Sequence, residues 1–84
     1  MYYFYLLKSR KTGKSYSGIT NDLKRRFYQH NHGFNKATKS YTPWDLIYYE
    51  AYLSKPLAEE REKMIKYKGK ALAGLKKRAG FDDD

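Results

Sequence analysis

The pattern of hydrophobic and polar positions divides the first part of the chain into two short strands joined by a polar turn. Residues 2–7 are continuously apolar and aromatic, which is typical of a strand buried on both faces. A polar connection with one glycine follows, and residues 15–19 are predicted to form a second strand, antiparallel to the first. Gly18 inside this second strand indicates a bulge or the close approach of another group to the backbone.

Helical periodicity begins directly after this hairpin. Residues 22–31 contain no glycine or proline, and Thr20 or Asn21 is suited to cap the N-terminus of the helix. At about 100° per residue, Leu23 and Phe27 share one stripe of the helix, which is therefore predicted to face the core. Residues spaced four apart beside this stripe are expected to line the edge next to the sheet.

The segment between this helix and the next strand, residues 32–45, has no clear period and carries two lysines but no acid before its last position. We expect a basic loop here, and a loop of this length in a compact domain is usually functional. Residues 46–52 return to a hydrophobic and aromatic run, which predicts the third strand of the sheet.

A second long helix is predicted after Ser54, with Pro56 tolerated in its first turn. One stripe of this helix is predicted to be buried: Leu57, Arg61, Met64 and Ile65. Ala58 and Glu62 follow the neighbouring edge, so Glu62 is expected beside the buried face. A final helix is predicted over residues 70–79. The fold class is therefore mixed α/β (α+β), a three-stranded antiparallel sheet flanked by three helices in the order β-β-α-β-α-α.

Composition then narrows the class of protein. The 84 residues carry 18 Lys+Arg and 9 Asp+Glu, a net charge of +9, and three of the acids form a C-terminal tail at residues 82–84. Residues 1–81, which we expect to form a single domain, hold 18 basic and 6 acidic side chains, a net charge of +12. A charge excess of this size indicates a polyanionic partner, most often nucleic acid.

The absence of cysteine excludes a disulfide-rich secreted protein, a cysteine zinc site and a thiol nucleophile. The N-terminal apolar run has no basic stretch before it and no small-residue cleavage pattern, so it is not a signal peptide. It is also far shorter than the ~20 apolar residues that span a bilayer. We therefore expect a cytoplasmic protein with no membrane partner. The sequence implies no particular obligate protein partner, and we expect a monomer or a weak dimer.

Five residues attract attention by their spacing: Tyr5, Tyr16, Arg26, His30 and Glu62. Tyr5 lies 11 residues before Tyr16 on the two predicted strands, and Arg26 follows Tyr16 by 10. His30 follows Arg26 by 4 on the same helix, so the two side chains are predicted to lie side by side. Each residue also has an ordinary interpretation: core tyrosines, a solvated arginine, a structural histidine, and a glutamate paired with Lys66.

In this order and spacing, the chain resembles the GIY-YIG nuclease family, whose two named tripeptides lie on the first two strands of a three-stranded sheet. Here the tripeptides are Tyr3-Phe4-Tyr5 and Tyr16-Ser17-Gly18. The likeness extends over residues 2–68 and includes three further runs: Asn21-Asp22-Leu23-Lys24-Arg25-Arg26, His30-Asn31-His32-Gly33 and Ala58-Glu59-Glu60-Arg61-Glu62. The resemblance implies an endonuclease that hydrolyses phosphodiester bonds. DNA, including nicked or branched DNA, is the expected substrate, and RNA remains an alternative.

The resemblance also implies a role for each of the five residues. Glu62 would be the single carboxylate ligand of Mg²⁺ or Mn²⁺, with substrate phosphates completing the coordination. Arg26 would neutralise charge on the phosphate oxygens. Tyr5 would be the general base toward water, with Tyr16 and His30 as hydrogen-bonding or proton-transfer neighbours. Since a phenol has a pKa of ~10, the base form costs about 4 kcal/mol at pH 7 unless nearby positive charge lowers that pKa.

Residues outside this group are candidates for contacts with nucleic acid. Four are basic and suited to phosphate: Lys24, Arg25, Lys36 and Lys39. Tyr41 is the candidate for stacking on a base. Solvated charges and simple packing are the alternatives for these residues. For the whole protein, the alternative is a domain of the same fold that binds DNA or RNA without cleaving it. No asparagine follows Asn35, whereas many family nucleases carry one after the metal-binding helix.

Overall fold

A computed structural model describes residues 1–67 together with residues 74 and 77. The predicted helix over residues 70–79 and the tail at 82–84 lie outside the described residues, apart from these two positions. The elements in chain order are β1 (Tyr2–Ser9), β2 (Ser15–Thr20), α1 (Leu23–Asn31), α2 (Lys36–Lys39), β3 (Trp44–Tyr52) and α3 (Lys55–Tyr67).

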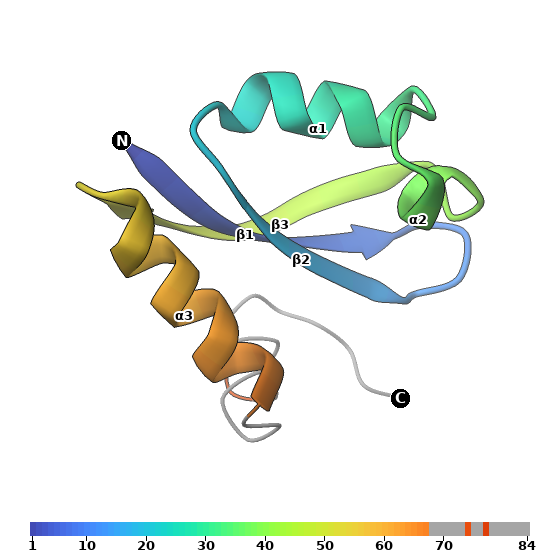
Figure 1. The fold of residues 1–84 in the computed structure, drawn as a ribbon. Coiled ribbons are helices and arrows are strands. Elements are labelled where there is room, and N and C mark those ends of the chain that lie inside the picture. Colours follow the sequence, from blue (N-terminus) through green and yellow to red (C-terminus); the bar gives the residue numbers. More distant parts are fainter. Residues whose placement is uncertain (68–73, 75–76, 78–84) are drawn as a thin grey trace.

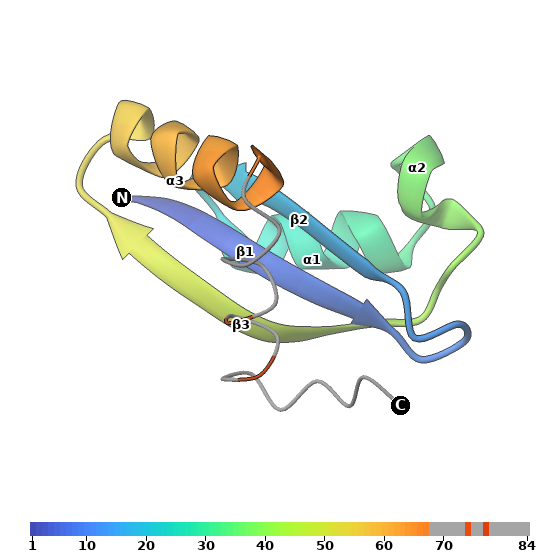
Figure 2. The same ribbon diagram turned by 90° about the horizontal axis from the view of Figure 1, so that it is seen from below.

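The strands form one antiparallel sheet in the order β2-β1-β3. Helix α1 lies over one face of this sheet and α3 over the other (Figure 1). In the view from below, α3 lies in front of the sheet and α1 behind it (Figure 2). The predicted fold class, mixed α/β built on a three-stranded antiparallel sheet flanked by helices, is confirmed. In the described residues the element order is β-β-α-α-β-α, because α2 precedes β3.

The central position of β1 explains why its sequence is apolar without alternation. Residues 4–7 are each at most 2% exposed. Phe4 packs against Ile65 of α3 on one face of the sheet. Tyr5 belongs to a second cluster with Trp44, on the face covered by α1. Burial of this strand on both faces, which its sequence predicted, is confirmed.

Helix α1 begins after Asp22, which is its N-cap. Asp22 has an extended backbone with φ −148°, and its side chain accepts a hydrogen bond from the backbone N–H three residues later. The prediction that Thr20 or Asn21 caps the helix was wrong, because the Thr20 hydroxyl instead accepts from the Asp22 N–H at 3.1 Å and forms the preceding turn. The predicted inward stripe is confirmed, since Leu23 and Phe27 pack against the core cluster on this face.

The segment 32–45, predicted to be a loop, contains the short helix α2. Asn35 caps this helix by accepting a hydrogen bond from the Ala37 N–H at 2.8 Å. A single helical turn is too short to show a period in the sequence, which is why the prediction missed it. Strand β3 also begins two residues before the predicted strand, because Trp44 pairs with the end of β1 and donates its N–H to Asn31 Oδ1 at 2.6 Å.

Helix α3 buries only part of the stripe that was predicted to face the core. Ala58 is 0% and Ile65 1% exposed, whereas Leu57 is 49% and Met64 42% exposed. The edge that carries Ala58 therefore faces the sheet. Glu62 follows this edge as predicted, with a side chain that is 23% exposed.

An ion pair joins β3 to α3 through Arg61, a member of the predicted stripe. Arg61 donates to both oxygens of Glu50, at 2.8 and 3.1 Å, and the hydroxyls of Tyr48 and Tyr52 donate to the same carboxylate, each at 2.6 Å. Burial alone would raise the pKa of Glu50, but Arg61 and the two hydroxyls together lower it. Arg61 is thereby held against the sheet, and Glu62 lies about 100° further round the helix.

Candidate active site

The hydroxyl of Tyr5 extends across the neighbouring strand because Gly18 leaves room for the ring. The two residues pair directly between β1 and β2. A Cβ at position 18 would lie 2.6 Å from the Tyr5 hydroxyl oxygen, a distance that real Cβ contacts essentially never show. The close approach predicted from this glycine is confirmed. The irregularity of the sheet lies elsewhere, between Leu6 and Leu7 on the β3 side of β1.

Replacing Gly18 with alanine is expected to displace the Tyr5 ring and to lower the free energy of unfolding by about 1–3 kcal/mol, the usual cost of overpacking a core. Denaturant unfolding at pH 7 measures this change. Ser17→Ala, a small substitution at the half-buried neighbouring position, is the control. Unfolding free energies of the two variants that agree within about 0.5 kcal/mol would contradict the predicted clash.

A chain of hydrogen bonds runs from Tyr5 through His30 to helix α2. The Tyr5 hydroxyl lies 2.8 Å from His30 Nε2, and His30 Nδ1 lies 2.9 Å from the Thr38 hydroxyl. Thr38 in turn donates to the backbone carbonyl of Asn35 at 3.4 Å. Since that carbonyl can only accept, the Thr38 hydroxyl accepts from His30 Nδ1–H. Nε2 is then unprotonated and accepts from the Tyr5 hydroxyl.

The surroundings of His30 agree with this assignment. The residue is 0% exposed, and burial, followed by the charge of Arg26, lowers its pKa to about 4. His30 is therefore neutral at pH 7. The ring of Tyr16 packs edge-on against it, with centroids 5.0 Å apart. His30 thus combines a fixed orientation with a free lone pair aimed at Tyr5.

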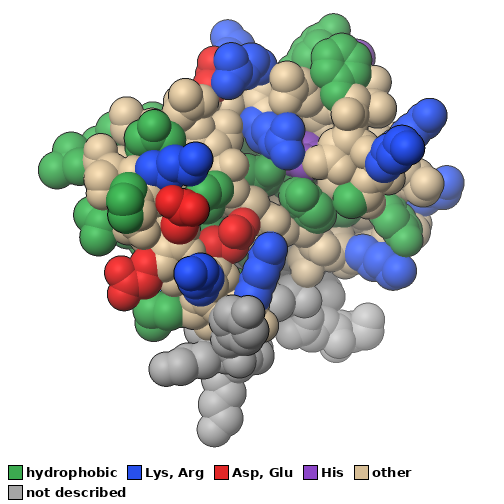
Figure 3. Space-filling model, viewed as in Figure 1, with side chains coloured by type: hydrophobic (Ala, Val, Ile, Leu, Met, Phe, Trp, Pro, Cys, Tyr) green, Lys and Arg blue, Asp and Glu red, His purple; other side chains and the backbone are tan. Residues whose placement is uncertain are grey.

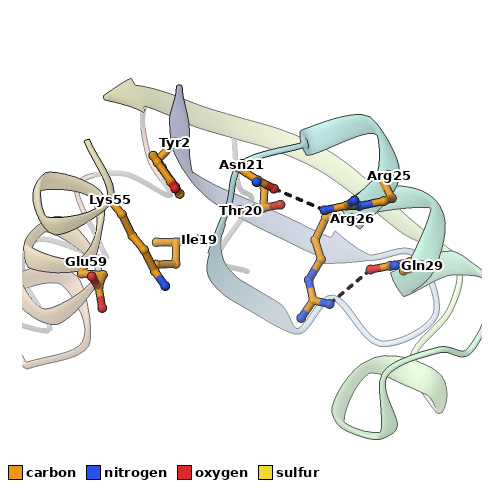
Figure 4. Close-up of a pocket in the computed structure, with 9 residues that line it drawn as sticks. All are labelled: Tyr2, Ile19, Thr20, Asn21, Arg25, Arg26, Gln29, Lys55 and Glu59. Atoms are coloured by element: carbon orange, nitrogen blue, oxygen red, sulfur yellow. Dashed lines mark hydrogen bonds between the residues drawn. The ribbon is translucent and has the colours of Figure 1, made fainter. Parts of the chain in front are cut away.

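Arg26 reaches the same hydroxyl from helix α1, where it lies one turn before His30. Its Nε donates to the Tyr5 oxygen at 3.4 Å. Its Nη1 donates to Gln29 Oε1 at 3.3 Å, a bond that Figure 4 shows. The hydrogen bond to Tyr5 raises the pKa of Arg26, with burial opposing it and Tyr16 adding to the rise. The guanidinium therefore stays charged while it contacts the site.

Burial raises the pKa of the Tyr5 hydroxyl by more than Arg26 lowers it. The hydrogen bond and charge of Arg26 favour the ionised form, whereas the neighbouring Tyr16 and Glu62 oppose it, and the net result is a pKa above the ordinary 10.0. Arg26 does reach Tyr5, as the sequence analysis required. Its charge is nevertheless insufficient to ionise a ring that is only 2% exposed.

Glu62 brings a carboxylate from α3 toward this group, close enough for its charge to raise the pKa of Tyr5. Lys66 lies at the outer limit of an ion pair with it, 3.9 Å from Nζ to Oε1. Residues 1–67 hold no cluster of three or more His, Asp or Glu side chains that could bind a metal. A divalent ion here would thus rest on one carboxylate, water and substrate phosphates. This donor set suits a hard ion such as Mg²⁺.

A cavity of about 530 Å³ opens beside Arg26, where the end of β2 meets the first turns of α1 and α3 (Figure 4). Arg25, Arg26 and Lys55 line it with positive charge, and Glu59 is the one acid in its lining. The Arg25 side chain is steadied by a 3.2 Å hydrogen bond from its Nη2 to Asn21 Oδ1. The cavity therefore favours an anionic group next to the Tyr5–Arg26 contact.

Comparison with known proteins shows the family to which the chain belongs. Residues 1–78 match the family described as the GIY-YIG catalytic domain. The chain belongs to the GIY-YIG family. It is 39% identical over 66 residues to a UPF0213 protein from Bacillus pumilus, a match that covers 77% of this chain and 66% of that protein. A UPF0213 protein from Clostridium perfringens is 40% identical over 67 residues, which cover 79% of this chain and 71% of the relative.

A solved structure supports the same assignment. The solution NMR structure of a UPF0213 protein from Bacillus halodurans superimposes with a TM-score of 0.53 at 33% identity, and covers 90% of this chain and 86% of that chain. A GIY-YIG domain implies a nuclease-type function on nucleic acid and, in general, the use of a divalent metal. Within the part of the chain that the structure describes, no helix is both long and apolar enough to cross a bilayer.

The residues predicted to contact nucleic acid lie on the outside of this GIY-YIG domain. Four are exposed on helices α1 and α2: Lys24, Arg25, Lys36 and Lys39. Lys and Arg side chains are spread across the face that carries these helices (Figure 3). Tyr41 is half-buried. Lys14 Nζ lies 5.0 Å from the centroid of its ring, and the Trp44 ring packs edge-on against it with centroids 6.2 Å apart. Part of its ring is thus already covered.

Sequence reasoning missed the residues that orient the candidate catalytic groups. Thr38, which fixes His30, lies in the segment predicted to be a loop, and no local pattern marks it. Gln29, which contacts Arg26, follows it by three residues on one helix, so i, i+3 spacing could have identified it. Lys55 and Glu59 meet α1 across the cavity only because of the tertiary packing of α3.

Proposed function

We propose that this GIY-YIG protein is an endonuclease that hydrolyses phosphodiester bonds in DNA with Mg²⁺ or Mn²⁺. The observation that carries the proposal is the meeting of three side chains at one hydroxyl: Tyr5 contacts His30 at 2.8 Å and Arg26 at 3.4 Å. Glu62 lies within electrostatic reach of the same point. The net charge of +9 favours binding to a polyanion.

The raised pKa of Tyr5 makes a free phenolate an unfavourable base, and the hydrogen bond to His30 supplies another route. The Tyr5 oxygen accepts a proton from the attacking water while its own proton passes to His30 Nε2. No phenolate accumulates, and the proton ends on an imidazole that was neutral beforehand. Thr38 and the Asn35 carbonyl hold the tautomer that leaves Nε2 ready to accept.

Charge that gathers on the phosphate oxygens is met by Arg26. Its Nε and Nη1 are engaged by Tyr5 and Gln29, and both bonds orient the guanidinium fork. The remaining N–H groups of the guanidinium are donors suited to a phosphate oxygen. A divalent ion bound at Glu62 would supply Lewis-acid charge to the same phosphate. Arg25 and Lys55 line the adjacent cavity and are suited to bind the neighbouring phosphate of the strand.

Metal-dependent cleavage tests this function. Linear and branched DNA are incubated with purified protein in Mg²⁺, in Mn²⁺ and in EDTA. Glu62→Gln is expected to need about 10- to 100-fold more metal for half-maximal cleavage, because the amide keeps the shape of the ligand and loses its charge. Glu60→Gln, an exposed position on the same helix, should behave as wild type. Equal cleavage by all three proteins would indicate a contaminating nuclease and refute the assignment.

A second function, nucleic-acid binding without cleavage, is favoured by one observation. Glu62 lies 3.9 Å from Lys66, so the carboxylate has a partner within its own helix. In this case Tyr5 and His30 would serve only to pack the core. Tight, salt-sensitive binding of DNA or RNA with no cleavage in any divalent metal would establish this function and eliminate the nuclease.

A further inference from the structure

The C-terminal end of helix α1 and the turn after it form an aromatic surface that the proposed chemistry does not use. Tyr28 is 55% and Phe34 69% exposed, and His32 is exposed beside them. The rings of Tyr28 and His32 are stacked with centroids 3.8 Å apart at an angle of 12°, and Phe34 packs edge-on against Tyr28 at 6.3 Å. These three residues are called the aromatic platform below. Hydrophobic side chains with a histidine beside them gather over this part of α1 (Figure 3).

The backbone holds the platform in place without burying it. His32 Nδ1 lies 2.8 Å from the Tyr28 carbonyl oxygen, which fixes one ring on the other. Gly33 has φ +76°, and this left-handed turn brings Phe34 back toward the helix, where its N–H donates to the Gln29 carbonyl at 3.1 Å. The platform is therefore ordered before any partner arrives, which lowers the entropic cost of binding on it.

Positive charge lies next to the platform. The aliphatic stem of Lys39 passes Gly33, with Cγ 3.6 Å from the position of a Cβ there, so its ammonium group belongs to the same surface. Lys24 is exposed one helical turn before Tyr28. Exposed aromatic rings flanked by cations match a nucleotide, whose base stacks on a ring while its phosphate contacts an ammonium group. A base inside a duplex has no free π-face, so this match requires an unpaired base.

We propose that the aromatic platform binds an unpaired base of single-stranded DNA beside the cleavage site. The choice of DNA rests on the proposed function. Tyr28 and Arg26 lie two residues apart on different sides of α1, a helix of about 10 Å diameter. A strand crossing α1 can therefore place one phosphate at Arg26 and an unpaired base, a few nucleotides away, on Tyr28. The platform would direct the enzyme to single-stranded segments, with Tyr28 and Phe34 in the stacking role predicted for Tyr41.

The test measures binding in EDTA, so that it does not depend on cleavage. A single-stranded oligonucleotide with one 2-aminopurine and the fully paired duplex of equal length are titrated against wild-type protein, Tyr28→Ala and Phe34→Ala. Each substitution is expected to weaken single-strand binding about tenfold and duplex binding by less than about twofold, with loss of the fluorescence quenching caused by stacking. Tyr49→Ala, a tyrosine on β3 that is also 55% exposed, should leave both affinities unchanged.

Equal losses on single strand and duplex, or an equal loss in Tyr49→Ala, would overturn the proposal. Tyr28→Trp keeps a stacking ring and should bind single strands as wild type does, which separates lost stacking from misfolding. Tighter binding of single-stranded RNA than of single-stranded DNA, lost in Tyr28→Ala, would refute DNA as the ligand. Sedimentation experiments measure the oligomeric state. If the wild type is a dimer that Tyr28→Ala dissociates without weakening DNA binding, the platform binds a second copy of the chain instead of DNA. Metal-dependent cleavage is measured in a separate experiment. The binding results therefore test the aromatic platform even if the protein proves not to be a nuclease.

Discussion

Arg26→Ala is expected to slow DNA cleavage by about 10²- to 10³-fold while weakening DNA binding by less than about tenfold. The reason is the position of the guanidinium. Its Nε bonds the Tyr5 hydroxyl and its Nη1 bonds Gln29, so the group is oriented before substrate arrives. Preorganised charge of this kind acts mainly on the transition state, where the phosphate oxygens carry more charge than in the ground state. Single-turnover kinetics with saturating protein measure the chemical step apart from binding.

Arg25→Ala provides a matched control one position away. Arg25 has the same charge on the same helix, but it bonds Asn21 and does not contact Tyr5. Its loss should weaken binding several-fold and leave the single-turnover rate within about twofold of wild type. Arg26→Lys keeps the charge and loses the planar fork, so it should recover only part of the rate. Equal rates for Arg25→Ala and Arg26→Ala would show that Arg26 has no special place in the reaction.

The candidate residues were selected from the sequence by their resemblance to the family, and local rules account for part of their arrangement. Pairing between two adjacent strands fixes Tyr5 opposite Gly18, and helical spacing fixes Arg26 beside His30. A glycine within a strand already indicated that something passes close to it, and the Tyr5 ring is that group. These rules could not predict the contact between Thr38 and His30. This contact depends on a single turn of helix whose cap, Asn35, shows no period in the sequence.

The packing of α3 illustrates a second limit. The stripe of Leu57, Arg61, Met64 and Ile65 was predicted to be buried. Of its apolar side chains only Ile65 is buried, and Ala58 from the neighbouring edge is buried with it. Glu50 on β3 has a part-buried carboxylate whose cation, Arg61, comes from α3. Hydrophobic periodicity along one element does not include this ion pair.

The protonation of Tyr5 illustrates a third limit, because it depends on the balance of two opposing effects. A cation at i, i+4 from His30 was expected to bring the phenol toward ionisation, and Arg26 does lower its pKa. Burial raises that pKa by more, and burial is a property of the assembled sheet and helix α1. From the sequence, the base role of Tyr5 was conditional on a lowered pKa, and the structure raises that pKa. In the proposed function, the hydrogen bond to neutral His30 offers the Tyr5 proton an acceptor instead.

His30 is expected to make the stability of the protein depend on pH in a defined window. Burial and Arg26 lower its pKa to about 4 in the folded protein, against an ordinary value near 6.5. Between these two values the unfolded chain binds a proton that the folded protein does not. The contribution of His30 is therefore fully present above about pH 6.5 and is lost as the pH falls toward 4. From pH 7 to pH 4.5 the free energy of unfolding should decrease by about 2 kcal/mol through this residue alone.

The lower limit of this window separates His30 from the two carboxylates of β3 whose pKa values are lowered. The pKa of Glu50 is lowered from 4.5 and that of Asp45 from 3.8, so their contributions to stability are lost mainly below pH 4.5. Urea unfolding is measured at pH 7, 6, 5 and 4.5 for wild type and His30→Gln. The amide cannot take up a proton in this range, so the variant should lose less than about 0.5 kcal/mol across it even if it is less stable at pH 7. If the free energy of unfolding changes equally with pH in the two proteins, His30 takes up protons as readily in the folded state as in the unfolded state. Nε2 would then not be kept unprotonated to accept the proton of Tyr5.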